Sequence, residues 1–267
     1  MTKQKLRAAA KSLAAALSPS EKALASDAIC DKILTLDAYR AAGSVFAFSR
    51  LAGEPDLTRV ITNAASSGKK VFLPVFIQGS CSILFRDVTA AAASGAYVKA
   101  AALFENKSYP AAAECGFERG SFSIMEPSDS FPEAVFATDA AVFATDEAVC
   151  VADEAVFATD EAVFATCVAD LPVKASAANG CPVEPHAVKV SPTNVSPVTA
   201  PALLLCPGLA FDKNGARLGR GAGCYDRFLS SHRSHFSAVA GVCFERQIFD
   251  VIPVDPHDER CDFTVFA

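Results

Sequence analysis

Apolar residues recur at helical spacing in the first part of the chain. Leu6, Leu13 and Leu17 fall on one face of a helix, because residues four and seven positions apart share a face. The segment Ser18–Glu21 has the serine-to-glutamate spacing of a capping box and a proline at the first helical position. We therefore expect a second helix to begin here and to continue to about Leu36.

Short apolar runs alternate with helical patterns in the rest of the chain. A helix capped by Asp56 is expected to continue to about Ser66, and Gly79 is placed to turn one strand back into a hairpin. This alternation of strands and helices predicts an α/β fold with helices packed on the faces of a sheet. The expected strands are Val45–Phe48, Val71–Phe76, Ile83–Val88, Ala202–Cys206 and Ala238–Phe244.

Residues 133–167 are five near-copies of the heptapeptide E-A-V-F-A-T-D. A period of seven is typical of a coiled coil, but the adjacent Val-Phe pair fits a spaced seam poorly and Thr and Asp weaken a helix. A strand is also disfavoured, because an odd repeat turns the apolar set to the other face at each copy. We interpret the segment as a loosely structured duplication, with a helical hairpin or a partner-binding helix as the alternative.

Six prolines and few large apolar residues follow between positions 171 and 201, which is typical of an extended linker. The predicted organisation is therefore one domain built from residues 1–132 and 201–267. It is interrupted by a heptapeptide-repeat insert at 133–170 and a Pro-rich linker at 171–200.

Charge and composition restrict the functional class. The chain has a net charge of −6, and residues 133–200 hold ten of its acids and only two lysines. The rest, with 20 acids and 22 bases, is nearly neutral and has no basic stripe, which argues against nucleic-acid binding.

A hydrophobic share of 51% excludes a wholly disordered chain. No apolar stretch approaches the roughly 20 residues of a membrane span, and no secretory signal is recognisable. We expect a soluble, cytoplasmic protein without a membrane partner, whose ten scattered cysteines are mostly reduced core residues.

The segment with the clearest chemistry is the glycine-rich loop Gly219–Gly223, followed directly by a predicted helix. Its three alternate glycines let backbone N–H groups approach an anion at the positive end of that helix. Arg217 and Arg220 could clamp phosphate oxygens, and Asp226 could hold Mg²⁺. The pattern is neither a Walker A sequence nor a G-x-G-x-x-G fingerprint. Taken alone, it is equally compatible with a tight turn flanked by surface arginines.

The complete string Pro207–Leu229, PGLAFDKNGARLGRGAGCYDRFL, resembles the signature of the 5-formyltetrahydrofolate cyclo-ligase family at nearly every fixed position. The resemblance covers residues 1–132 and about 200–267, and it leaves the repeat and the linker outside. Further segments that resemble the family in the expected order are Lys3–Arg7, Gly53–Asp56, Ser123–Pro127 and Ile252–Asp262.

This resemblance implies a three-layer α/β/α sandwich with a mostly parallel central sheet, here interrupted by a low-complexity acidic insert. It also implies an ATP- and Mg²⁺-dependent enzyme that converts 5-formyltetrahydrofolate to 5,10-methenyltetrahydrofolate, ADP and phosphate. The formyl oxygen would be phosphorylated first, and N10 would then attack the activated carbon. We expect a monomer with a small-molecule substrate, and the acidic repeat could have an unknown partner.

The resemblance also assigns roles to residues of this chain. Outside the family context, Lys3 and Arg7 would be read as a solvated helix face, Glu54 as a loop carboxylate and Phe122 as a core aromatic. ATP binding falls on Lys3, Arg7, Arg217, Leu218, Gly219, Arg220, Gly221, Ala222, Gly223, Cys224 and Tyr225. Folate binding falls on Glu54, Phe122, Arg220, Gly221, Ala222, Gly223 and Cys224. Catalysis falls on Arg220, Cys224 and Tyr225, and Mg²⁺ binding on Asp226 and Asp258.

Cys224 departs from the family pattern, which has tyrosine or phenylalanine at this position. A thiol supplies neither the aromatic ring nor the phenol donor. A second hypothesis is therefore a folate- or nucleotide-binding module of the same fold with weakened catalysis. A third is an interaction protein whose acidic repeat recruits a partner.

Overall fold

The computed structural model describes residues 2–77, 79–136, 143–145, 148–150 and 194–267. The chain divides into two compact units, the larger formed by Met1–Ala137 with Asn194–Ala267 and the smaller by Thr138–Thr193. In the smaller unit the structure describes two antiparallel strands, β7 (Phe143–Thr145) and β8 (Ala148–Cys150). Most of the predicted repeat and residues 171–193 of the predicted linker lie outside the described residues.

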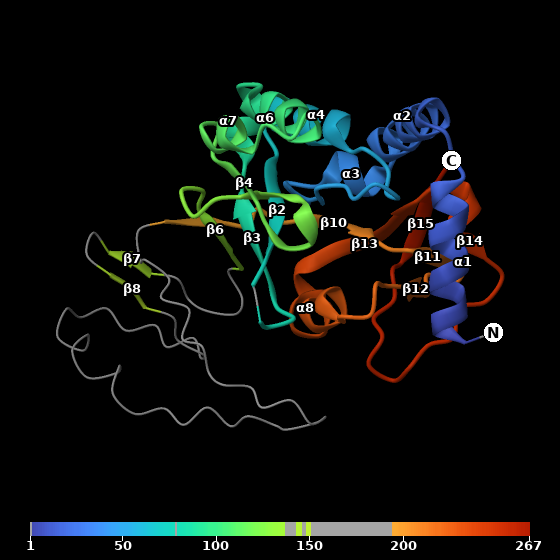
Figure 1. Cartoon of the computed structure of the whole chain (residues 1–267). Coiled ribbons are helices and arrows are strands. Elements are labelled where there is room, and N and C mark those ends of the chain that lie inside the picture. The colour runs from blue at the N-terminus through green and yellow to red at the C-terminus, as the bar shows by residue number, and fades with distance from the viewer. Residues whose placement is uncertain (1, 78, 137–142, 146–147, 151–193) are drawn as a thin grey trace. The chain divides into compact units, whose positions relative to one another are not determined.

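The larger unit alternates helices and strands (Figure 1). Its helices are α1 (Lys3–Ala15), α2 (Pro19–Thr35), α3 (Asp37–Ala41), α4 (Thr58–Ser66), α5 (Thr89–Ala93), α6 (Ala96–Glu105), α7 (Tyr109–Ala113) and α8 (Cys224–His232). Its strands are β1 (Ser44–Phe46), β2 (Lys70–Phe76), β3 (Ile83–Asp87), β4 (Phe117–Arg119), β5 (Met125–Pro127), β6 (Glu133–Val135), β9 (Val195–Pro197), β10 (Ala202–Pro207), β11 (Ala210–Asp212), β12 (Arg217–Leu218), β13 (Phe236–Cys243), β14 (Ile248–Phe249) and β15 (Phe263–Phe266). Short 3₁₀ turns span Ser121–Ser123, Arg233–His235 and Glu245–Gln247.

Local signals place several of these elements where the sequence predicts them. The Ser18 hydroxyl accepts a hydrogen bond from the N–H of Glu21 at 3.2 Å, and the Glu21 carboxylate accepts one from the N–H of Ser18 at 2.7 Å. This capping box begins α2, as predicted. The Asp56 carboxylate accepts a hydrogen bond from the N–H of Thr58 at 2.8 Å at the start of α4. The predicted hairpin is confirmed, because β2 and β3 pair antiparallel.

Eight strands form the main sheet in the order β15-β13-β10-β1-β2-β3-β6-β9. Five of the seven pairings are parallel, and only those of β3 with β2 and with β6 are antiparallel. The prediction of an α/β fold with a mostly parallel central sheet is confirmed. The sequence does not predict β15, a short strand at the edge of the sheet. It pairs with β13, which lies about 20 residues earlier in the chain.

Alternate residues of each central strand pack on opposite faces of the sheet, as strand geometry requires. On one face, Val45 of β1 and Leu203 of β10 belong to a cluster with residues of α2, α4, α5 and α6. On the other face, Phe46 and Leu204 pack with residues of α8. Figure 1 shows α2, α4, α6 and α7 gathered on one side of the sheet and α8 on the other. The strands are therefore covered on both faces, which explains their continuous apolar sequences.

Helix α1 packs on a smaller sheet of β12, β11 and β14. Leu6 and Ala10 of its apolar face contact Ala210 and Leu218 of that sheet. This contact brings the polar side of the first turn of α1 close to the loop that follows β12.

The sheet extends beyond the domain limits that the sequence predicts, which are residues 132 and 201. Glu133–Val135 forms β6 and Val195–Pro197 forms β9, and the two strands pair parallel. Phe136 follows β6 and stacks on Phe46 of the core, with ring centroids 5.6 Å apart. The first copy of the repeat therefore contributes a strand to the main sheet and an aromatic side chain to its core. None of the helices that the structure describes is long and apolar enough to cross a membrane.

Candidate active site

A pocket of about 360 Å³ lies at the carboxyl ends of three neighbouring strands of the main sheet. Ser49 follows β1, Phe76 ends β2 and Pro207 ends β10, and all three residues line the pocket. β1 pairs parallel with both β2 and β10, so these strand ends meet at one edge. Ligands of α/β proteins commonly bind at this edge. Every residue to which the sequence analysis assigned a role also lines this pocket.

The glycine-rich loop forms one wall of the pocket, between β12 and α8. Gly221 has a φ of 112° and Gly223 a φ of 68°, values that side chains with a Cβ rarely adopt. Arg7 of α1 donates from Nε to the Gly219 carbonyl at 3.0 Å. Arg227 of α8 donates to the Ala222 carbonyl as well. Two arginines from different helices therefore hold the loop in place.

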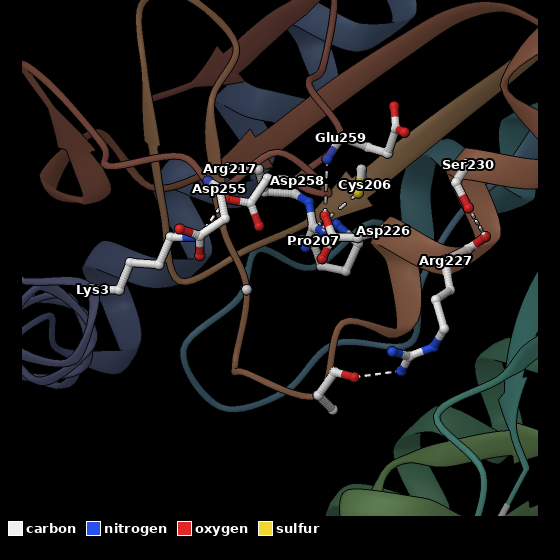
Figure 2. Close-up of polar contacts among 12 residues, drawn as sticks. Lys3, Cys206, Pro207, Arg217, Asp226, Arg227, Ser230, Asp255, Asp258 and Glu259 are labelled. Carbon is white, nitrogen blue, oxygen red and sulfur yellow. Dashed lines mark hydrogen bonds and ion pairs between the residues drawn. The ribbon is translucent and has the colours of Figure 1, made fainter. Parts of the chain in front are cut away.

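A buried ion pair joins β12 to the start of α8 (Figure 2). Arg217 Nη2 donates to Asp226 Oδ1 at 2.6 Å, and the Arg217 side chain is only 4% exposed. The same carboxylate oxygen accepts a hydrogen bond from the N–H of Glu259 at 3.3 Å. Arg217 and Asp226, predicted to bind phosphate and metal separately, thus contact each other, and Asp226 also contacts the residue next to Asp258.

A second group of charges lies where α1 meets the 255–258 loop, as Figure 2 shows. Lys3 Nζ contacts Asp255 Oδ2 at 2.7 Å and forms an ion pair with Asp258. Burial favours a lower pKa for Lys3, but its hydrogen bonds to both carboxylates raise the pKa above its usual value. Burial favours a higher pKa for Asp258, but the hydrogen bond from Lys3 holds the pKa below its usual range. One ligand atom each from Asp255, His257 and Asp258 lies within 4.8 Å of the others.

Arg220 of the glycine-rich loop forms an ion pair with Glu54, and its Nη2 donates to Glu54 Oε1 at 3.0 Å. Glu54 is 6% exposed, and its other oxygen accepts the N–H of Leu51 at 2.9 Å. Burial raises the pKa of Glu54, although the Leu51 N–H and the Arg220 charge oppose this shift. The two residues therefore form a polar contact that a hydrogen-bonding ligand could share.

Aromatic rings complete the pocket. Phe122 is 55% exposed, and its ring lies perpendicular to that of Phe76 with centroids 5.5 Å apart. The ring of Tyr225 of α8 also lies edge-on to that of Phe76, with centroids 6.5 Å apart. Three of the six buried side-chain atoms that lack a hydrogen-bond partner among the described residues belong to pocket residues, namely Ser49 Oγ, Arg217 Nε and Tyr225 OH. Such atoms are costly to bury unless a ligand or water satisfies them.

Cys224 lies at the first position of α8 and lines the pocket. Burial raises the pKa of its thiol, and the nearby Cys81 adds to this shift. The side chain is therefore a neutral thiol at pH 7, which is a weak hydrogen-bond donor.

Ten lining residues of this pocket received no role from the sequence, and four of them bear on its chemistry. His257 and Asp255 stand inside the closing segment that was compared with the family pattern, so their positions were visible but only Asp258 received a role. Phe76 and Ser49 have no sequence motif that marks them as pocket residues. Phe76 is an apolar residue at the end of a buried strand, and Ser49 is a small residue that follows one.

Comparisons with known proteins identify the family of this chain. The model of the 5-formyltetrahydrofolate cyclo-ligase family matches residues 1–136 and 174–266. The chain is 42% identical over 67 residues to the 5-formyltetrahydrofolate cyclo-ligase of Mus musculus, which covers 24% of this chain and 33% of that one. It is 48% identical over 56 residues to the enzyme of the same name from Mycolicibacterium smegmatis, covering 21% and 28%. These matches span about a third of the length of the curated relatives.

A solved structure has a similar fold. The solution NMR structure of 5,10-methenyltetrahydrofolate synthetase from Aquifex aeolicus has a TM-score of 0.56 and 20% sequence identity, and the match covers 100% of this chain and 90% of that one. At this identity the likeness shows the fold alone. The family model, in contrast, covers most of the chain on both sides of the repeat. The chain therefore belongs to the 5-formyltetrahydrofolate cyclo-ligase family.

Proposed function

We propose that this protein converts 5-formyltetrahydrofolate to 5,10-methenyltetrahydrofolate with consumption of ATP. The observation that carries the proposal is that all residues assigned by the family resemblance line one pocket at the carboxyl ends of β1, β2 and β10. In the proposed reaction, the N5-formyl oxygen attacks the γ-phosphorus and ADP leaves. N10 then attacks the activated carbon, loses its proton, and inorganic phosphate departs.

The glycine-rich loop and four cations suit a triphosphate. Backbone N–H groups at the start of α8 bind anions, and the positive end of the helix dipole faces the same region. We assign phosphate binding to Lys3, Arg7, Arg217 and Arg220, which surround this loop. Phosphoryl transfer depends mainly on positioning and charge neutralisation, and these groups provide both.

The acidic residues fit a magnesium ion. Carboxylate oxygens are the protein ligands that Mg²⁺ prefers, and Asp258 lies beside Asp255 and His257 in a cluster on the phosphate side of the pocket. We assign ion binding to Asp258 and Asp226, with Asp255 as a neighbouring carboxylate. A bound Mg²⁺ would neutralise charge on the phosphates. Ion pairs orient both carboxylates: Lys3 pairs with Asp258, and Arg217 pairs with Asp226.

The folate would occupy the opposite side. Glu54 can accept hydrogen bonds from the N–H groups of a pterin edge, and Arg220 orients its carboxylate. The exposed ring of Phe122 offers a face for packing against a planar heterocycle. We place the formyl group near Arg220, Cys224 and Tyr225, between the two halves of the pocket.

Arg220→Ala tests this assignment. Removal of one donor that stabilises developing charge typically costs about 10²–10³ in kcat, so we expect a loss of at least about 100-fold in the rate of methenyl product formation. The matched control is Arg246→Ala, because Arg246 is an exposed arginine that pairs with Glu21 outside the pocket. Equal rates for the two variants would contradict the assignment.

A second candidate function, a folate- or nucleotide-binding module with weakened turnover, is favoured by the neutral thiol of Cys224. Cys224→Phe restores a ring, and Cys224→Tyr restores a ring and a phenol. If turnover is limited by the missing phenol, Cys224→Tyr should raise kcat by about tenfold or more, and Cys224→Phe should not. Calorimetry would show folate and nucleotide binding in all three proteins. Equal kcat values would show that the thiol does not limit the reaction.

A partner for the acidic repeat, a monomeric state and a cytoplasmic location remain proposals. The partner is testable by deleting residues 138–193 and comparing pull-down and turnover with the full chain. Because β6 and β9 pair parallel, the deletion needs a replacement linker of about a dozen residues. Loss of a captured protein with unchanged turnover would support the proposal, and identical pull-downs would contradict it.

A further inference from the structure

The turn that carries Phe122 has an unusual backbone. Phe122 has a φ of 56° and Ser123 a φ of 59°, the left-handed region that costs residues with a Cβ about 1–2 kcal/mol each. Two such residues in succession persist only when their surroundings hold them. The turn lies between β4 and β5, and the ring it presents is the exposed aromatic of the pocket.

Glu126 of β5 lies directly behind this turn. It is 5% exposed, and its Oε2 accepts a hydrogen bond from the N–H of Phe76 at 3.4 Å. Its other oxygen, Oε1, is buried without a hydrogen-bond partner among the described residues. A Cβ added to Gly120 would lie 1.9 Å from the Cδ of Glu126. The backbone of the turn therefore packs against the carboxyl group itself, and a side chain at position 120 would have to displace that group.

The same carboxyl group also contacts the other aromatic residue of the folate side. Ser121 in the turn donates its hydroxyl to the Phe76 carbonyl at 3.3 Å, and the N–H of Phe76 donates to Glu126. The ring of Phe122 rests edge-on against the ring of Phe76. Glu126 thus touches both backbone segments that carry this ring pair.

We propose that Glu126 is a positioning residue of the folate side of the pocket: its buried carboxyl group fixes Phe76 and the 120–123 turn, so that the ring of Phe122 stands over the bound pterin. The inference rests on the proposed function. It assigns no contact between Glu126 and the substrate.

The charged neighbours of Glu126 do not offer it an ion pair. Glu118 lies directly opposite on β4, and Arg119 follows it, but both side chains are exposed. Arg119 donates to the Ser123 hydroxyl at 2.8 Å instead. On β2 the only charged side chain is Lys70, which pairs with Asp87 at 2.9 Å. Burial accordingly raises the pKa of Glu126 to about 7, although the N–H groups of Phe76 and Ser121 oppose the shift.

A double-mutant cycle in the full-length chain tests the proposal. Calorimetry would give the Kd of 5-formyltetrahydrofolate for Glu126→Ala, Phe122→Ala and the double variant. An aligned aromatic contact contributes up to about tenfold in affinity, so we expect each single variant to lose about tenfold and the double variant no more than either. Glu126→Gln should recover most of the affinity, and the Kd of ATP should stay within about twofold. A double variant about 100-fold weaker, or an equal loss of ATP affinity, would overturn the proposal.

Amide hydrogen exchange separates this test from the proposed function. In Glu126→Ala we expect the amides of Phe76 and of residues 121–123 to exchange at least about tenfold faster than in the unmodified chain. The matched control is Glu118→Ala, which removes an exposed carboxylate from the paired position of β4 and should leave these amides unchanged. Unchanged exchange in Glu126→Ala refutes the positioning role whatever the protein binds. Faster exchange in a chain without folate affinity refutes the proposed function alone.

Discussion

Replacement of Glu126 by glutamine should change how the stability of the protein depends on pH. Glutamine keeps the shape of the side chain but has no charge at any pH. Burial raises the pKa of Glu126 from an ordinary value of 4.5 to about 7 in the folded protein. Between these two values the unfolded chain loses the proton while the folded chain retains it. The free energy of unfolding therefore falls as the pH rises through this window.

The size of this effect follows from the shift. A displacement of one pKa unit corresponds to about 1.4 kcal/mol, so the unmodified protein should lose about 3 kcal/mol of stability between pH 4.5 and pH 8 relative to Glu126→Gln. Titrations of all other groups occur in both proteins and cancel in the difference. At pH 4.5 the two proteins should be similar in stability, and at pH 8 the variant should be the more stable one.

Urea unfolding at a series of pH values measures this difference directly. Glu118→Gln is the matched control, because this exposed carboxylate on the paired strand should leave the pH dependence within about 0.5 kcal/mol of the unmodified protein. A difference between Glu126→Gln and the unmodified protein that stays constant from pH 4.5 to pH 8 would refute the reasoning. So would a stability that rises with pH relative to the variant.

Three further predictions concern the phosphate side of the pocket and the turn between β11 and β12. Lys3→Met should raise the KM for ATP about tenfold, while Lys5→Met, which changes an exposed lysine of the same helix, should leave steady-state kinetics unchanged. Asp226→Asn leaves a buried guanidinium without its carboxylate, so urea unfolding should show a loss of about 3 kcal/mol; a loss under 1 kcal/mol would count against the pairing. Gly215→Ala should be far more destabilising than Gly68→Ala in thermal melts. Both positions have a φ near 76°, but only at the first would the new Cβ lie 2.0 Å from a backbone oxygen; equal melting temperatures would contradict this.

Local chemistry made much of the fold and the pocket predictable. The predicted turn at Gly79 gave the antiparallel pairing of β2 and β3, and Ser18 with Glu21 gave the start of α2. The glycine-rich loop and α8 are adjacent in sequence, so their anion-binding geometry was visible in the string from Pro207 to Leu229. These features depend on residues fewer than about five positions apart.

Other features depend on contacts between distant parts of the chain. Glu126 accepts a hydrogen bond from the backbone of Phe76, which lies 50 positions earlier in the sequence. No sequence pattern around either residue predicts this contact. Strand β15 has only four residues, and it is identified as a strand by its pairing with β13. Arg217 and Asp226 were both identified, but each was assigned to a ligand. Only the structure shows that they pair with each other.

The central claim is that the glycine-rich loop, its arginines and the facing aromatic rings form one site for ATP and 5-formyltetrahydrofolate. The most direct measurement follows the purified full-length protein with both compounds and Mg²⁺, recording methenyl absorbance and ADP together. We expect one ADP for each methenyl product and no ADP release when the folate is omitted. ADP release that does not depend on folate, or folate and ATP both unchanged after prolonged incubation, would contradict the account.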